Sequence, residues 1–335
     1  MKICVIGAGS WGTAIAGVAA ARADEVCLWS FDTQSAEGIN ASHRNPLYLS
    51  DYELPANVSA STSYEAALAG SDGIIVVVPS PFLRATMHGA APYIASETPV
   101  LVLTKGIEAN TGKLMTDVVA DEIGNPSRVA ALSGPNHAEE VCRGSLSAAV
   151  IACEVEGLAR FFRDLLISPT FRIYISTDVV GVETCAAEKN VIAIACGIAA
   201  GAGYGDNTLA LIMTRGIAEI SRIVHARGGD AMTCMGLAGM GDLVVTCTSE
   251  HSRNRTFGVA FAHGESLEEY QARTHMIVEG AVAARSVTQM ARRIGVDAPL
   301  TFAVDAVLHE GRSFEDALAI LTDRNPGEEF YGIDK

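Results

Sequence analysis

A lysine inside an apolar helix is the residue of this chain best suited to acid–base chemistry. Lys189 lies within the apolar run of residues 184–195 and is followed by Asn190. Burying an ammonium group is costly unless the group is paired or its pKa falls. A lysine with a lowered pKa can act as a general base near neutral pH. The alternative is a lysine on the one exposed stripe of the helix, paired with Glu188 or another neighbour.

A glycine-rich segment further along the chain carries an acid and then a polar helix start. Glycines surround Asp242, Thr246 follows about one helical turn later, and Ser252, Arg253 and Asn254 then open a helix-like run. Arginine binds phosphate in a bidentate geometry, so this helix start is suited to hold an anionic group. The alternative is a cluster of arginines at the surface.

Three glycines between an apolar strand and a small-residue helix form a third candidate site. Residues 3–6 are apolar, Gly7, Gly9 and Gly12 follow, an alanine-rich helix comes next, and residues 26–30 form a second apolar run. This order is typical of dinucleotide binding, because the glycines permit a tight turn, close approach of a pyrophosphate and close helix packing. The helix N-terminus adds N–H donors and a partial positive charge for phosphates. The alternative is a glycine turn that binds nothing.

The elements that position these residues begin with a sheet. Up to about residue 176, strand-like and helix-like runs alternate. The further strand candidates, mostly continuous apolar runs, lie at residues 58–60, 74–78, 100–103, 129–132, 148–152 and 172–175. The pattern predicts a doubly wound, mostly parallel, Rossmann-type sheet. Ligands bind beyond the carboxyl ends of such strands, so Lys105, directly after one of them, is a ligand-facing candidate; its alternative is a solvated loop lysine.

After residue 177 the strand pattern disappears and helix-like runs follow. They lie at residues 179–200, 208–227, 253–263, 281–294, 300–309 and 314–321. Pro299 and Ser313 stand where they favour helix starts. The sequence therefore predicts an α/β protein of two domains: a dinucleotide-binding domain at residues 1–177 and an all-helical substrate and catalytic domain at residues 178–335.

Composition and charge argue against several classes of protein. With 335 residues and a formal net charge of -15, the chain is expected to bind neither nucleic acid nor an anionic membrane surface. No apolar run is long enough to span a membrane, and the first strand leaves no room for a signal peptide, so we expect a cytoplasmic protein. The eight cysteines are scattered singly, which indicates neither a zinc site nor a disulfide framework.

Together these candidate sites indicate a hydride-transfer enzyme. A nicotinamide cofactor, NAD or NADP, would supply the hydride chemistry, while the protein supplies positioning and a proton acceptor. An alcohol loses hydride only as its hydroxyl proton leaves, so a base must lie beside the substrate oxygen. Lys189 is the expected base, oriented by Asp242. Ser252, Arg253 and Asn254 are expected to hold an anionic tail.

Several motifs of the chain, in order, resemble those of the NAD(P)-dependent glycerol-3-phosphate dehydrogenases, in particular the bacterial type. They span nearly the whole length, at residues 6–14, 76–80, 104–106, 133–135, 138–139, 189–193, 239–243, 246–247, 252–255 and 278–280. The resemblance implies reversible reduction of dihydroxyacetone phosphate to sn-glycerol 3-phosphate, a small phosphorylated substrate. It also implies supply of glycerol 3-phosphate for phospholipid synthesis, and a homodimer.

The resemblance further implies roles for individual residues. Lys189 would be the proton acceptor, with Asn190, Asp242 and Thr246 as its catalytic companions. The residues that would contact the substrate are Lys105, Gly134, Asn136, Asp242, Ser252, Arg253 and Asn254. Those at the cofactor would be Ser10, Trp11, Tyr48, Lys105, Ala138, Arg253, Ile277 and Glu279. The glycine motif itself adds Gly7, Gly9 and Gly12, and the position after the second strand adds Phe31 and Asp32. No metal is expected at any of them.

The residues after the second strand depart from the family's bacterial pattern. Arg, Lys or His commonly stand there and can hold the 2′-phosphate of NADP, whereas this chain has Phe31 and Asp32. Asp32 lies near the place where an acid binds the ribose of NAD. The charge therefore favours NADH. Use of both cofactors is the alternative, because Arg44 could still reach a 2′-phosphate.

Two further departures concern the substrate and the base. Asn136 stands where the family usually has Ser or Thr, and its amide can still donate to a phosphate. Glu188 stands where the family usually has an apolar residue, and if it faced Lys189 it would raise the pKa of the lysine. Adjacent helical residues diverge by about 100°, so we expect Glu188 to face elsewhere.

Three alternatives compete with this assignment. A 3-hydroxyacid or 6-phosphogluconate dehydrogenase shares the two-domain plan and a helix-borne Lys-Asn pair, but residues 239–243 and 252–255 favour glycerol 3-phosphate over a carboxylate-bearing substrate. A non-catalytic dinucleotide sensor would need no base such as Lys189. A methyltransferase with an adenosyl cofactor disagrees with the strict glycine turn and the helical Lys-Asn segment.

Overall fold

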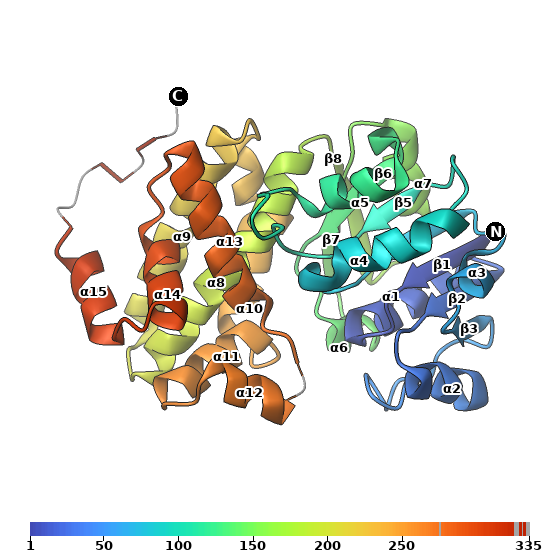
Figure 1. Ribbon diagram of the computed structural model, residues 1–335, viewed down its shortest axis with the longest axis horizontal. Coiled ribbons are helices and arrows are strands. Elements are labelled where there is room, and N and C mark those ends of the chain that lie inside the picture. Colours follow the sequence, from blue (N-terminus) through green and yellow to red (C-terminus); the bar gives the residue numbers. More distant parts are fainter. Residues whose placement is uncertain (275, 325–327, 330, 333–335) are drawn as a thin grey trace. The chain divides into compact units, whose positions relative to one another are not determined.

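The computed structural model describes residues 1–274, 276–324, 328–329 and 331–332. Contacts divide the chain into two compact units, whose elements are labelled in Figure 1. The sheet unit comprises Met1–Thr104 and Met115–Val179, and the helical unit comprises Lys105–Leu114 and Val180–Lys335. The sequence did not indicate that Lys105–Leu114, hereafter the 105–114 strap, would group with the helices.

The sheet unit contains one eight-stranded sheet with the order β3-β2-β1-β4-β5-β6-β7-β8. The strands are β1 (Lys2–Ile6), β2 (Glu25–Trp29), β3 (Val58–Ser61), β4 (Gly73–Val76), β5 (Val100–Val102), β6 (Val129–Ser133), β7 (Ser147–Ala152) and β8 (Phe171–Ser176). Neighbouring strands are parallel except for the antiparallel pair of β6 and β7. The predicted doubly wound, mostly parallel sheet is confirmed, and each expected strand is present.

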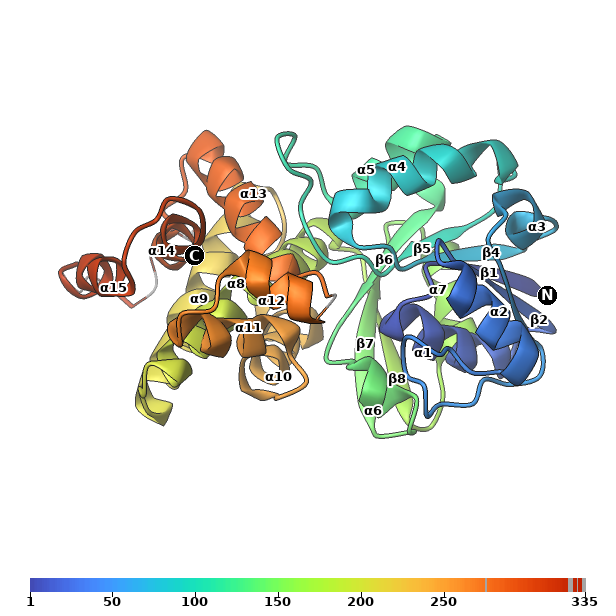
Figure 2. The ribbon, with the colours of Figure 1, turned by 60° about the horizontal axis from the view of Figure 1, so that its bottom comes forward.

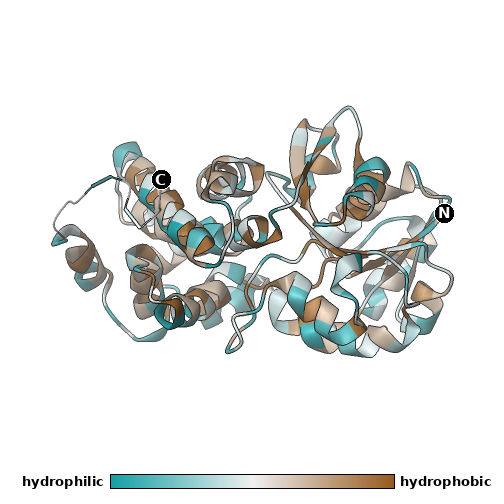
Figure 3. Cartoon of the chain, turned by 90° about the horizontal axis from the view of Figure 1, so that it is seen from above, coloured by the Kyte–Doolittle hydropathy of each residue, from teal (hydrophilic) through white to brown (hydrophobic). Residues whose placement is uncertain are grey.

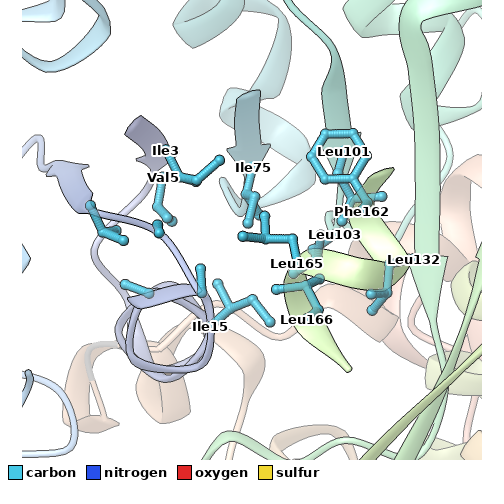
Figure 4. Packing of buried hydrophobic residues seen from close by; sticks show 14 of the residues in the cluster. Ile3, Val5, Ile15, Ile75, Leu101, Leu103, Leu132, Phe162, Leu165 and Leu166 are labelled. Carbon is cyan, nitrogen blue, oxygen red and sulfur yellow. The ribbon is translucent and has the colours of Figure 1, made fainter. Parts of the chain in front are cut away.

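Side chains of the strands alternate between two faces, and each face is buried under its own helices. Ile3 and Val5 of β1 pack with α1 (Ser10–Ala20), α2 (Thr33–Ser42) and α7 (Glu156–Leu166), as the cluster in Figure 4 shows in part. Cys4 and Ile6 pack on the other face with α3 (Tyr64–Leu68), α4 (Ser80–Ala90) and α5 (Met115–Ile123). In Figure 2, α1 and α4 lie on opposite sides of the sheet. Burial of both faces explains the continuous apolar strands.

The remaining short helices of the sheet unit lie in its connections. They are η1 (Ala91–Tyr93), η2 (Pro126–Arg128) and α6 (Ala138–Val141). The turn from β1 into α1 requires glycine at Gly12, because a Cβ there would lie 1.8 Å from the carbonyl oxygen of Gly7. Nothing lies within 4 Å of a Cβ built on Gly9, which precedes α1 with a φ of -74°. The packing of α1 on the turn thus requires glycine at Gly12, whereas the space beside Gly9 is open.

The helical unit is organised around α8 (Val179–Gly201), which is buried along most of its length. Its partners are α9 (Asp206–Ala226), η3 (Ala231–Met235), η4 (Leu237–Gly241), α10 (Asp242–Thr248), α11 (Arg253–Ala262), α12 (Leu267–Thr274), α13 (Glu279–Ile294), α14 (Pro299–His309) and α15 (Phe314–Thr322). Val191 and Ile194 of α8 pack with Phe257 of α11, and Ala187 packs with Ile223 of α9. α8 therefore joins both apolar clusters of this unit.

Every helix expected after residue 177 is present, with ends within two residues of the prediction. Pro299 is the first residue of α14, and Ser313 caps α15 by accepting a hydrogen bond from the backbone of Asp316. The sequence did not indicate α10 and α12. α10 follows a run of glycines and α12 is short and polar, so neither shows a clear apolar helical period.

Most surface helices of both units combine polar and apolar residues. Figure 3 shows this as teal and brown segments within single helices. Within the part of the chain that the structure describes, no helix is long and apolar enough to cross a membrane. Their apolar sides instead contribute to the buried clusters, as expected for amphipathic helices that cover a core.

Replacing Gly12 with alanine should destabilise the sheet unit, since the new methyl group would meet the Gly7 carbonyl at 1.8 Å. We expect the free energy of unfolding to fall by about 1–3 kcal/mol. Gly9→Ala is the matched control, and it should change stability by less than about 0.5 kcal/mol, because the space over Gly9 is open. Urea unfolding followed by circular dichroism measures both. Equal losses in the two variants would contradict this packing argument.

Candidate active site

The carboxylate of Asp242 is shared by two lysines of the helical unit. Lys105 Nζ donates a hydrogen bond to Oδ2 at 2.8 Å, and Lys189 Nζ donates one to Oδ1 at 2.7 Å. Asp242 is the first residue of α10. The single π-helical turn η4 immediately precedes it. The structure thus brings together three residues from the strap, α8 and α10.

The amine of Lys189 is oriented by two acceptors. Its side chain is 6% exposed, and besides Asp242 it donates to the hydroxyl of Thr246 at 2.7 Å. That hydroxyl in turn donates to the backbone carbonyl of Asp242 at 2.6 Å. A neutral lysine amine has two N–H groups, and these two acceptors take both, which leaves the lone pair to accept a proton. The alternative of an exposed Lys189 paired with Glu188 is wrong.

Burial and the neighbouring charges set the protonation of this cluster. Burial lowers the pKa of Lys189 to about 8; Asp242 opposes this shift and the ammonium of Lys105 adds to it. Burial alone would raise the pKa of Asp242, but the two lysines outweigh it and hold that pKa below its ordinary value. Asp242 is therefore ionised at neutral pH, while Lys189 changes its protonation close to neutrality.

Glu188 lies apart from Lys189 even though the two are adjacent in α8. It is fully buried, and neither of its carboxyl oxygens has a hydrogen-bond partner within the described residues. Burial, with Glu219 of α9 adding to it, raises the pKa of Glu188 well above its ordinary value. The charged groups that act on Lys189 are Asp242 and Lys105. Glu188 thus faces elsewhere, as predicted.

Two asparagines and a glycine tie the helices around Lys189. Asn254 Nδ2 donates to Asn190 Oδ1 at 2.9 Å, and Asn254 Oδ1 accepts from the backbone N–H of Gly280 at 2.9 Å. A Cβ on Gly280 would lie 2.5 Å from the carbonyl oxygen of Asn190. Close packing of α13 on α8 therefore requires glycine there. The amide of Asn254, predicted to bind substrate, holds three helices together.

The other predicted residues of the helical unit lie at helix starts. Ser252 caps α11, because its hydroxyl accepts from the backbone N–H of Arg255 at 3.3 Å. Arg253 is the first residue of α11 and is exposed, whereas Lys105 is only 18% exposed in its side chain. Lys105 is therefore not a solvated loop lysine. The predicted cofactor residues Ile277 and Glu279 lie just before and at the start of α13.

The predicted residues of the sheet unit gather mainly after three strands. Ser10 and Trp11 begin α1 after β1, Phe31 and Asp32 follow β2, Gly134 and Asn136 follow β6, Ala138 begins α6, and Tyr48 lies after α2. The N-terminus of α1 has no side-chain cap, and the indole N–H of Trp11 is buried without an acceptor among the described residues. With the open space over Gly9, these groups fit the pyrophosphate and adjacent polar groups of a dinucleotide.

Asp32 has a structural role as well as a charge. Its Oδ1 accepts from the backbone N–H of Ser35 at 2.9 Å, which caps α2. Arg44, considered above for a 2′-phosphate, pairs with Glu53 at 2.7 Å. The acid at the carboxyl end of β2 is therefore fixed in place by the helix it caps.

Asn45 supports the glycine turn and was not indicated by the sequence. It is fully buried, its Nδ2 donates to the carbonyl of Ala8 at 2.8 Å and to Thr13 Oγ1 at 2.9 Å, and its Oδ1 accepts from the backbone N–H of Tyr48. Nothing in the residues around this loop asparagine indicates that it would support the glycine turn. Only the fold brings it to the turn.

All eight cysteines are free thiols, and seven of them are buried, as expected of core residues. Across the described residues, no three His, Cys, Asp or Glu side chains come together in a way that could hold a metal ion. Lys105, Asp242 and Lys189 instead form a largely buried cluster of ionisable groups.

Comparison with known proteins gives the same family for both units. Residues 2–159 match the family model for the N-terminus of NAD-dependent glycerol-3-phosphate dehydrogenase, and residues 178–319 match the model for its C-terminus. A protein of Corynebacterium urealyticum named glycerol-3-phosphate dehydrogenase (NAD(P)+) is 45% identical, with 97% of this chain and 98% of that protein covered. One of Streptomyces griseus with the same name is 44% identical, with 97% of each covered.

Solved structures agree with these matches. The crystal structure of glycerol-3-phosphate dehydrogenase from Coxiella burnetii has a TM-score of 0.92 and 36% sequence identity, covering 96% of this chain and 99% of that one. The enzyme of the same name from Saccharomyces cerevisiae has a TM-score of 0.83 and 26% identity, covering 97% and 99% of the two chains. The two-domain similarity therefore extends over nearly the full length.

Removing the charge of Asp242 should destabilise the protein, because two lysines would be left without the carboxylate that balances their positive charges. For Asp242→Asn we expect a loss of about 3–5 kcal/mol at pH 6–7, shrinking at higher pH as Lys189 becomes neutral. Asp305→Asn is the control, since Asp305 is equally buried but pairs with a single, half-exposed Arg285; about 1 kcal/mol is expected there. Urea unfolding at several pH values measures both. A loss no larger for Asp242→Asn would contradict the shared-carboxylate argument.

Proposed function

The chain belongs to the NAD-dependent glycerol-3-phosphate dehydrogenase family, and we propose that Lys189 moves the proton as it interconverts dihydroxyacetone phosphate and sn-glycerol 3-phosphate. The observation that carries this role is the orientation of the lysine amine. Asp242 and Thr246 accept its two N–H groups at 2.7 Å each, so the lone pair of the neutral amine is left for the substrate hydroxyl. A buried lysine with a pKa of about 8 is suited to both directions of the reaction.

The protein's own groups then account for the proton. In oxidation of glycerol 3-phosphate, neutral Lys189 accepts the hydroxyl proton, and the carboxylate of Asp242 stabilises the ammonium that forms. In reduction, the ammonium keeps Asp242 and Thr246 as acceptors and donates its third N–H to the carbonyl oxygen. The nicotinamide, when bound, supplies the hydride chemistry. Thr246 acts through Lys189, and Asn190 acts through Asn254, so both are positioning residues in this scheme.

We assign the substrate phosphate to groups that suit a dianion. Arg253 is exposed at the N-terminus of α11, where backbone N–H groups and the helix dipole add to its charge. Ser252 keeps its hydroxyl hydrogen available, because its oxygen only accepts in the cap. Lys105, Gly134, Asn136 and Asn254 complete the proposed set of substrate contacts.

We assign the dinucleotide to the carboxyl ends of the strands. The pyrophosphate of the dinucleotide would contact Gly7, Gly9 and Gly12, with Ser10 and Trp11. The further proposed contacts are Phe31, Asp32, Tyr48, Lys105, Ala138, Arg253, Ile277 and Glu279. NADH is the proposed preference over NADPH, supported by the position of Asp32 at the end of β2 and by the engagement of Arg44 with Glu53. A carboxylate there repels a 2′-phosphate and accepts from a ribose hydroxyl.

The cellular setting of the enzyme follows from its family alone. We propose that it is cytoplasmic, that it acts as a homodimer and that its glycerol 3-phosphate supplies phospholipid synthesis. A 3-hydroxyacid or 6-phosphogluconate substrate would also suit a helix-borne Lys-Asn pair. The family of the chain favours glycerol 3-phosphate over both of these alternatives.

Replacing Lys189 with methionine should remove turnover and leave cofactor binding intact. Methionine keeps the apolar stem of the side chain but offers no proton acceptor, so kcat should fall by about 10²–10⁴-fold. Absorbance at 340 nm follows the oxidation of NADH with dihydroxyacetone phosphate, and NADH fluorescence gives the cofactor Kd. The thermal midpoint controls for folding. Near-normal turnover would remove Lys189 from the role of base.

Removing the charge of Asp32 should shift cofactor choice toward NADPH. Asparagine caps helices as well as aspartate does, so Asp32→Asn changes the charge without releasing α2. We expect the ratio of kcat/KM for NADH to that for NADPH to fall by about tenfold. Asp24→Asn, just before the same strand and exposed, is the control and should leave the ratio unchanged. An unchanged ratio in Asp32→Asn would show that this acid does not select the cofactor.

A further inference from the structure

The 105–114 strap belongs with the helices by its contacts, although the chain reaches it directly from β5. Thr104 and Met115 group with the sheet unit, whereas Lys105–Leu114 groups with the helical unit. Ile107 and Leu114 face each other in an isolated antiparallel bridge. Both are buried, in one cluster with Ala187 of α8 and Met290 of α13. The base of the strap is therefore anchored in the core of the helical unit.

The tip of the strap is held by two arginines. Arg293 of α13 donates from Nη2 to the carbonyl of Asn110 at 3.0 Å and from Nη1 to the carbonyl of Thr111 at 2.9 Å. Arg227, directly after α9, donates to the carbonyl of Gly112 at 3.1 Å. Three consecutive carbonyls thus point at guanidinium groups, which make strong charge-assisted hydrogen bonds.

The backbone that presents these carbonyls has an unusual conformation. Asn110 has a φ of 67°, in the left-handed region that an L residue other than glycine seldom adopts, and Gly112 has a φ of 75°. Within the strap, backbone N–H groups donate from Glu108 to Lys113 at 2.9 Å, from Gly112 to Glu108 at 3.0 Å and from Thr111 to Ala109 at 2.9 Å. The Thr111 hydroxyl donates to Glu108 Oε2 at 2.6 Å and accepts from the backbone N–H of Lys113 at 3.2 Å. None of these bonds engages the carbonyls of Asn110, Thr111 and Gly112 that the arginines hold. External hydrogen bonds offset the cost of ordering such a segment.

Lys105, the first residue of the strap, connects the strap to the proposed active site. It lies two positions before the buried anchor Ile107, and its ammonium reaches Asp242 at 2.8 Å. Asp242 and Cys247 act on Lys189 from α10, and Lys105 acts on it from the strap. If Lys105 withdrew, Lys189 would lose a repelling positive charge and keep Asp242 to itself. Both changes favour the protonated form of Lys189.

We propose that Arg293 is a positioning residue of the reaction, assisted by Arg227: by clamping the tip of the 105–114 strap it fixes Lys105 on Asp242. The inference rests on the proposed function, since Lys105 is there assigned to the substrate and to the charge balance of Lys189. Neither arginine is among the residues that the sequence or the family resemblance assigned to the site.

The test compares two adjacent arginines of α13. Arg293→Ala removes the clamp, whereas Arg292→Ala removes an equal charge whose guanidinium lies over the Phe302 ring, 5.4 Å from its centroid. For Arg293→Ala we expect the KM for dihydroxyacetone phosphate to rise by about 3- to 10-fold. The pH at which the kcat/KM of glycerol 3-phosphate oxidation reaches half its plateau should move upward. Arg292→Ala should leave both quantities unchanged.

Hydrogen exchange gives a readout that does not depend on activity. In Arg293→Ala the amides of Glu108 and Gly112 should exchange faster than in the wild type, and in Arg292→Ala they should not. Arg293→Lys keeps the charge but not the forked donor, so it should fall between the wild type and Arg293→Ala in KM and in exchange. If Arg293→Ala does not fold, as its thermal midpoint will report, Arg293→Lys and Arg292→Lys form the matched pair.

Two results would overturn the inference. One is faster exchange in the strap with an unchanged KM and pH profile, because Lys105 would then be held without the clamp. The other is a fall in kcat alone, shared with Arg292→Ala, which would indicate a general loss of folded enzyme. Failure of the proposed function looks different: the wild type itself would oxidise neither NADH nor NADPH with dihydroxyacetone phosphate.

Discussion

Asp242 accepts hydrogen bonds from Lys105 and Lys189 inside the helical unit, and the rest of the site depends on this shared, buried carboxylate. Two ammonium groups so close together would repel strongly in a medium of low dielectric constant. The carboxylate between them allows both to be present, but burial still keeps the pKa of Lys189 near 8. The same interaction that permits a buried lysine therefore leaves that lysine able to exchange a proton near neutral pH.

Three parts of the helical unit hold this cluster in place, and each uses a different kind of contact. The helical backbone that runs from η4 into α10 fixes the position of Asp242. The amides of Asn190 and Asn254 tie α8 to α11 and α13. The strap brings Lys105 in through buried apolar anchors and arginine-held carbonyls. The sheet unit carries the groups proposed to bind the dinucleotide at the carboxyl ends of its strands, around an uncapped helix start.

What the sequence predicted well is what local pattern controls. The glycine turn, the continuous apolar strands and the amphipathic helices depend on residues close together in the chain, and so does the unusual setting of Lys189 in α8. The family resemblance added residues such as Tyr48, Ile277 and Glu279 to the predicted site. Contacts between distant segments were not predictable in this way. The partner network of Asn254, the support of the turn by Asn45 and the arginine contacts of the strap are all set by the packing of helices.

The most direct test of Lys189 as the proton-transferring group is the pH dependence of kcat/KM in both directions, from about pH 6.5 to 9.5. Oxidation of glycerol 3-phosphate needs neutral Lys189, so its kcat/KM should rise with pH to a plateau, with an apparent pKa of about 8. Reduction of dihydroxyacetone phosphate needs the ammonium and should fall through the same pKa. A profile that is flat across this range, or one whose limb persists unchanged in Lys189→Met, would contradict the assignment of the proton to Lys189.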